Sequence, residues 1–82
     1  MNIQLIEGQF SSRDALKIIT EIIHVNIRFH ENKIKDHTNE KDMKTHENQI
    51  KEMQKKLFEV GSLIKYNESN LNLKSSIEII SI

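Results

Sequence analysis

Histidine carries the chemistry that is easiest to locate in this chain, because two histidines lie in a repeated motif. The tripeptide His-Glu-Asn begins at His30 and again at His46, and each copy is followed after one residue by Ile-Lys. Two imidazoles brought together could bind a metal ion, with His37 adding a third nitrogen ligand for zinc. They could also form a pH-sensitive contact, since neighbouring histidines disfavour protonation of both rings.

A packing role is nevertheless the better interpretation of this motif. Neither copy places two ligands four residues apart on one helix face, as the zinc motif H-E-x-x-H does. Catalysis has no stronger support: no serine lies in a nucleophile elbow, and the only two glycines, Gly8 and Gly61, form no phosphate-binding loop. We therefore expect no enzyme activity and no cofactor, and a histidine-based metal site stays as an alternative.

Charge is spread evenly along the chain. Twelve lysine and arginine residues balance twelve aspartate and glutamate residues, and residues 1–30, 31–50 and 51–82 each stay within one charge of neutral. A strand followed by two helices also occurs in ribbon-helix-helix DNA-binding proteins, but the polar strand residues Asn2, Gln4 and Glu7 are not groups that bind phosphate. We expect neither a nucleic-acid partner nor a membrane partner.

The size of the chain, 82 residues, predicts one domain covering residues 1–82. No apolar run approaches the ~20 residues that span a bilayer, and the amino terminus lacks a signal-peptide pattern, so a cytoplasmic protein is expected. The chain has no cysteine, which excludes disulfides and thiolate metal sites. Because a domain this small is marginally stable alone, oligomerisation is the expected reinforcement.

Two long helices are predicted, over residues 12–36 and 40–66, with the turn at residues 37–40. Ser11 can cap the first helix, with Asp14 three residues later, and Asn39 can cap the second. The second helix carries one apolar seam with alternating spacings of three and four residues, the period of helix–helix packing. Its members are Met43, His46, Ile50, Met53, Leu57, Val60 and Ile64.

A matching stripe on the first helix predicts that the two helices fold back on each other. Six stripe residues reflect onto the seam about the turn, because the residue numbers of each pair sum to 76 or 77. The pairs run from Ile34 with Met43, through His30 with His46, to Leu16 with Val60. The predicted fold is therefore mostly α, a long antiparallel helical hairpin with short strands at both termini.

The terminal strands are predicted at residues 2–7 and 77–82. Ile3 and Leu5 alternate with polar residues in the first strand, Gly8 is expected to end it, and isoleucine dominates the second. Near the end of the second helix, Phe58 and Leu63 lie off the seam and are expected to gain burial against the strands. Gly61 marks either a close contact or an early end of that helix.

A second apolar stripe on the first helix remains without a partner in this hairpin. The strands could cover its beginning, but leaving the remainder in water would forfeit about 1.5–3 kcal/mol for each large side chain. We therefore expect a two-fold homodimer in which the first helix packs on its own copy to form a four-helix bundle. The expected interface residues are Ala15, Ile18, Ile22, Val25 and Phe29.

The expected function is that of a non-enzymatic protein-interaction module, a homodimeric scaffold or a regulatory subunit. The alternative is a small regulator, of the kind represented by antitoxins and anti-sigma factors, that binds a different protein through the same stripe. Both hypotheses make the second stripe of the first helix the functional surface.

Overall fold

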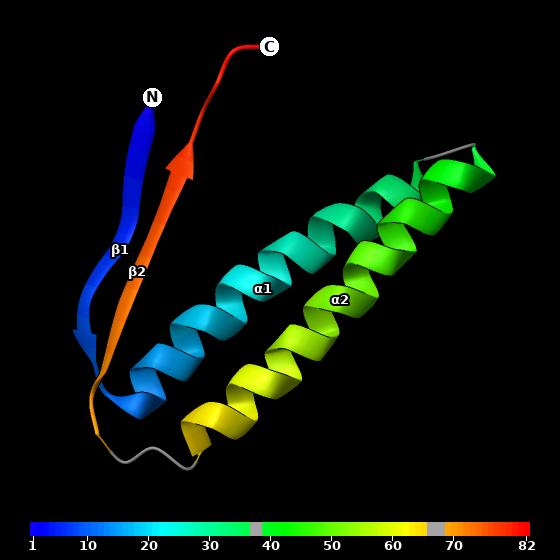
Figure 1. Cartoon of the computed structure of the whole chain (residues 1–82). Coiled ribbons are helices and arrows are strands. Elements are labelled where there is room, and N and C mark those ends of the chain that lie inside the picture. Colours follow the sequence, from blue (N-terminus) through cyan, green and yellow to red (C-terminus); the bar gives the residue numbers. More distant parts are fainter. Residues whose placement is uncertain (37–38, 66–68) are drawn as a thin grey trace.

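The computed structural model describes residues 1–36, 39–65 and 69–82. The elements follow in the order β1 (Asn2–Phe10), α1 (Ser12–Lys35), α2 (Glu40–Lys65) and β2 (Leu71–Glu78). The two helices lie side by side as a hairpin, and β1 pairs antiparallel with β2 in a two-stranded sheet (Figure 1). The mostly helical hairpin with a strand near each terminus is confirmed, and residue 66, the predicted end of the second helix, lies outside the described residues.

Both helices begin at the caps that the sequence predicts. Ser11 has an extended backbone, and its Oγ accepts a hydrogen bond of 3.1 Å from the backbone N–H of Asp14. Asn39 uses Oδ1 to accept a hydrogen bond of 2.9 Å from the N–H of Lys41. These bonds satisfy amide groups that the first turn of a helix leaves without intrahelical partners.

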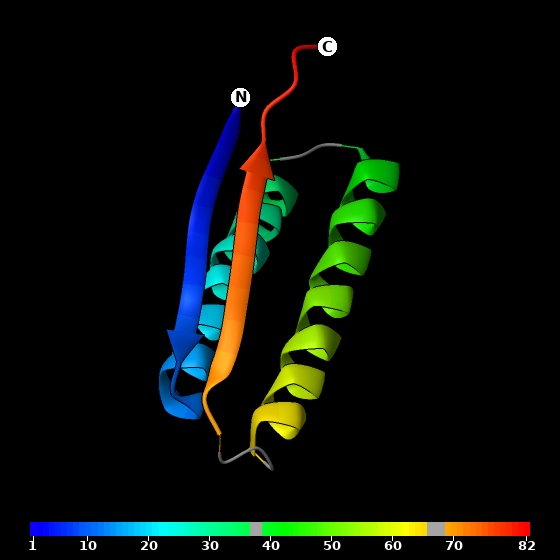
Figure 2. The same ribbon diagram turned by 60° about the vertical axis from the view of Figure 1, so that its left-hand side comes forward.

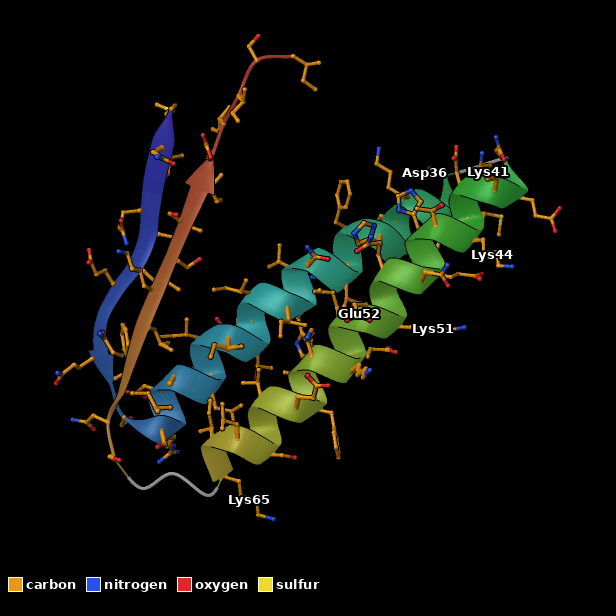
Figure 3. The ribbon with its side chains drawn as sticks, viewed as in Figure 1. Asp36, Lys41, Lys44, Lys51, Glu52 and Lys65 are labelled. Carbon is orange, nitrogen blue, oxygen red and sulfur yellow. The ribbon has the colours of Figure 1, made fainter. Side chains whose placement is uncertain are left out.

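The seam of α2 packs on α1 along its whole length. Every predicted seam residue is buried or half-buried, and Ile64 is the most buried of them, with 5% of its surface exposed. The charged side chains of Lys44, Lys51 and Lys65 project away from α1 (Figure 3). A narrow apolar seam with a charged opposite face is the pattern of a helix that has one partner.

The carboxyl end of α2 shows that this single partner is α1. The expectation that Phe58 and Leu63 are buried is wrong, since they are 77% and 71% exposed. Among the described residues α2 contacts α1 but neither strand, so no element covers these two side chains. Gly61 neither ends α2 nor makes a close contact, because a Cβ placed there would meet no atom within 4 Å.

The strands differ from the prediction in their bounds. Gly8 does not end β1 but adopts a φ of +149°, and the strand continues to Phe10. β2 occupies Leu71–Glu78, so the prediction of a strand over residues 77–82 is wrong for most of its length. The pairing of Phe10 with Leu71 explains this shift, because Phe10 directly precedes the α1 cap and its partner must lie at the same end of the sheet.

α1 is the central element of the molecule. It contacts α2 on one side and both strands on another, and turning the molecule by 60° brings the sheet in front of α1 with α2 beside them (Figure 2). The strands meet α1 near its amino end and diverge from it toward the chain termini (Figure 1). No helix within the described residues is long and apolar enough to cross a bilayer.

Candidate functional site

His30 and His46 face each other across the hairpin, as the six-pair register predicts. Their Nδ1 atoms lie 2.7 Å apart and their ring centroids 5.0 Å apart, and both side chains are half-buried. At this separation one ring donates its Nδ1–H to the Nδ1 lone pair of the other ring. The accepting Nδ1 therefore carries no hydrogen. The repeated motif thus places one interhelical hydrogen bond inside an otherwise apolar seam.

The two rings are not part of a larger group of potential metal ligands in the described part of the chain. No three His, Cys, Asp or Glu side chains there are grouped so that they could hold a metal ion. His37, the third candidate ligand, lies outside the described residues. A zinc ion takes at least three protein ligands, so His30 and His46 by themselves supply an incomplete set.

The second stripe of α1 is covered at its beginning and exposed at its end. Ala15 is fully buried and Ile18 is partly buried beneath the strands. Ile22, Val25 and Phe29 are 43%, 60% and 54% exposed. The strands therefore reach only the first half of the stripe, and three large apolar side chains remain on the outer face of α1.

The sheet adds further exposed apolar residues, which the pattern of its sequence does not predict. Side chains of directly paired residues lie on the same face of a sheet, and successive residues alternate between faces. Ile77 pairs with Ile3 and is two residues beyond Ser75, which faces α1. Both isoleucines therefore lie on the face of the sheet that is turned toward α1, yet 38% of Ile3 and 44% of Ile77 stay exposed, because the strands have already diverged from the helix.

Because of a β-bulge, a simple alternation of inward and outward residues does not predict this surface. The register shifts between Gln4 and Ile6, where Leu5 is the extra residue of β1. Without that insertion the alternation would place Gln4 rather than Ile3 on the inner face. The opposite face of the sheet is polar in every pair: Asn2 with Glu78, Gln4 with Ser76, Glu7 with Lys74, and Gln9 with Asn72.

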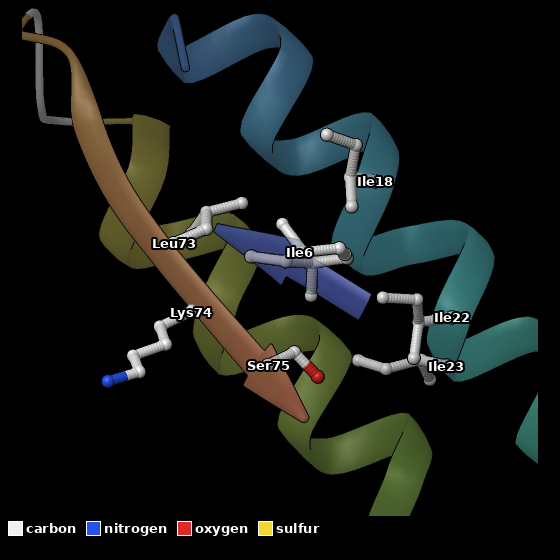
Figure 4. A pocket seen from close by; sticks show the side chains of 8 residues that line it. Ile6, Ile18, Ile22, Ile23, Leu73, Lys74 and Ser75 are labelled. Atoms are coloured by element: carbon white, nitrogen blue, oxygen red, sulfur yellow. The ribbon is translucent and has the colours of Figure 1, made fainter. Parts of the chain in front are cut away.

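An open pocket of about 260 Å³ lies where the sheet and α1 begin to separate. Ile6 and Leu73 point into it from the strands, and Ile18 and Ile22 line it from the helix, whereas Lys74 points away (Figure 4). The walls are mostly apolar, with one hydroxyl from Ser75, so water gains few hydrogen bonds there. The pocket opens beside Ile22, the first exposed residue of the stripe.

Phe29 is the aromatic member of the stripe and is held on the outer surface of α1. Its ring meets the His30 ring edge to face, with centroids 5.2 Å apart, and the Nζ of Lys33 lies 5.6 Å from its centroid. These contacts fix the phenyl ring while leaving about half of the residue exposed.

No protein-family model, no curated protein and no solved structure matches the chain.

Proposed function

We propose that the chain is a non-enzymatic protein-interaction module that acts as a homodimer, with the outer face of α1 as its contact surface. The observation that carries the proposal is the exposure of Ile22, Val25 and Phe29 on one helix face, together with the exposure of Ile3 and Ile77 on the inner face of the sheet. Large apolar side chains that stay exposed together on one element mark an interaction site more often than an inert surface.

The free energy available from covering this surface favours association. Fully burying a large apolar side chain is worth about 1.5–3 kcal/mol, and each of the five residues is already ordered on a helix or a strand. Ordering costs on binding are therefore small, because no segment has to fold first. A helix face with an aromatic anchor is also the surface that packs in two-fold helical dimers, which would unite two hairpins into a four-helix bundle.

Sedimentation across micromolar concentrations tests the proposal. The wild-type chain is expected to sediment at twice its monomer mass of 9.7 kDa, and Ile22→Lys is expected to return it to the monomer. Phe58→Lys is the matched control, because Phe58 is an exposed apolar residue of α2 outside the proposed surface. A wild-type monomer at every concentration, or equal dissociation by both variants, would contradict the proposal.

If the wild-type chain is a monomer, the same surface is instead proposed for the alternative function, binding of a different protein. That outcome is recognisable in the wild-type chain before any variant is made. Binding of a different protein to this surface is expected to leave the contact between His30 and His46 in place, since both rings face the hairpin interior rather than the outer face of α1.

A further inference from the structure

The pocket between α1 and the sheet needs an occupant, and the stripe of α1 carries one of suitable shape. An apolar cavity of ~150 Å³ holds a benzene molecule, so a pocket of about 260 Å³ has room for one phenyl ring. Phe29 presents such a ring on the same face of α1, but within one chain it lies seven residues beyond Ile22 at the mouth of the pocket. Seven residues of helix span about 10 Å, which is too far for Phe29 to fill its own pocket.

We propose that the homodimer is antiparallel along α1 and that Phe29 of each copy fills the pocket of the other, an inference that rests on the proposed function. Around a two-fold axis that passes between the two α1 helices at the level of His24 and Val25, the residue numbers of positions at the same level sum to 49. Phe29 then lies at the level of position 20 along the second copy, midway between Ile18 and Ile22, which form the helical wall of the pocket.

Charge on the flank of the stripe selects the same register independently. Glu21 and Arg28 are two helical turns apart and therefore lie on the same flank of α1. Their numbers also sum to 49, so the axis that seats Phe29 brings Glu21 of each copy beside Arg28 of the other. In a parallel arrangement the two-fold axis would run along the helices, so this flank of the two copies would lie on opposite sides of the interface and Glu21 would not meet Arg28.

The geometry is isologous, as a two-fold interface requires. Each dimer contains two buried phenyl anchors, each inside an apolar pocket, and two opposite-charge pairs at the rim. Aromatic anchors in pockets dominate binding free energy, whereas rim charges mainly set orientation and discriminate against wrong arrangements. Phe29 is therefore expected to control affinity, and Glu21 with Arg28 to control orientation.

A charge-exchange experiment tests the orientation. Glu21→Arg creates two like-charge contacts in its own homodimer, and so does Arg28→Glu, so each variant alone is expected to self-associate about five- to tenfold more weakly. An equimolar mixture restores opposite charges in both contacts, and heterodimers are expected at wild-type affinity. Each variant changes a solvent-exposed residue, and circular dichroism checks that the helices remain.

The pocket is tested with Phe29→Ala, which removes the anchor. A loss of at least ~30-fold in dimer affinity is expected, the effect of deleting a central anchor residue. Phe58→Ala removes an exposed phenyl ring from α2 and is expected to leave affinity unchanged. Because the wild-type chain has no cysteine, a mixture of Glu21→Cys and Arg28→Cys chains gives a third readout: disulfides form between the two variants and not within either alone.

The outcomes separate this inference from the proposed function. A wild-type chain that never dimerises refutes both. A wild-type dimer keeps the homodimer but refutes the antiparallel register if its charge variants associate normally without a preference for heterodimers, and if Glu21→Cys and Arg28→Cys chains form no disulfide with each other. A wild-type dimer that tolerates Phe29→Ala refutes the filled pocket.

Discussion

His30 and His46 share a hydrogen bond that links α1 to α2 inside an otherwise apolar seam. The bond is short, 2.7 Å between the two Nδ1 atoms, and both rings are half-buried. It also fixes register, because sliding one helix by a turn would separate the two nitrogens by about 5 Å and leave polar atoms facing apolar neighbours. The pair therefore acts as a polar marker of the correct alignment between two stripes that are otherwise similar along their length.

A double-mutant cycle on this pair should give a measurable coupling. His30→Ala and His46→Ala each leave the other imidazole in the seam without its partner. The two single variants are therefore expected to lower the free energy of unfolding, in sum, by more than the double variant does. The expected coupling is about 0.5–1.5 kcal/mol, the net worth of one hydrogen bond. Urea denaturation of the four proteins measures it, and additive effects would show that the contact contributes nothing to stability.

Burial on α2 predicts which apolar residues stabilise the hairpin. Ile64→Ala removes a side chain that is 5% exposed and is expected to cost about 2–5 kcal/mol. Phe58→Ala removes a larger side chain that is 77% exposed, and its cost is expected to stay within about 0.5 kcal/mol. Thermal or urea unfolding of the two variants compares them on one helix. Equal costs would mean that α2 has a second partner along its outer face.

The helical hairpin could be predicted because each of its signals is local and repeated. The spacing of the α2 seam, its reflection onto α1 and the two cap residues Ser11 and Asn39 all concern side chains a few residues apart, and six pairs must agree at once. His30 and His46 are found in contact for that reason alone. Phe58 and Leu63 were misassigned because an apolar residue off the seam does not reveal whether any element reaches it.

The bounds and register of the sheet could not be predicted because they depend on pairing between residues that are far apart in the sequence. β2 begins at Leu71 because Leu71 pairs with Phe10, which is more than sixty positions away in the sequence. The residues near Leu71 carry no local signal of that pairing. The single extra residue at Leu5 then reverses the alternation of β1, so a simple period of two assigns Ile3 to the wrong face. The pocket and the apolar inner face of the sheet, formed by this pairing, were hidden for the same reason.

The cap at Ser11 should contribute to the stability of α1. Its Oγ satisfies the backbone N–H of Asp14, and Ser11→Ala leaves that amide to water at a cost of about 1 kcal/mol. Ser11→Asp retains an acceptor and adds negative charge at the helix start, so it is expected to match the wild type. Ser62→Ala, in the exposed interior of α2, is the control and should be neutral or slightly stabilising. A Ser11→Ala variant as stable as this control would show that the cap is dispensable.

Gly61 and Gly8 predict opposite responses to the same substitution. At Gly61 the chain is helical and a Cβ would meet no atom within 4 Å, so Gly61→Ala is expected to stabilise the protein by about 0.5–1 kcal/mol through improved helix propensity. At Gly8 the φ of +149° is one that residues with a side chain rarely adopt, and Gly8→Ala is expected to destabilise the protein by about 1–3 kcal/mol. Urea unfolding of both variants provides the measurement. A destabilising Gly61→Ala would indicate that another molecule, such as a partner chain, approaches α2 at this position, because no residue described within the chain itself lies close enough to be displaced.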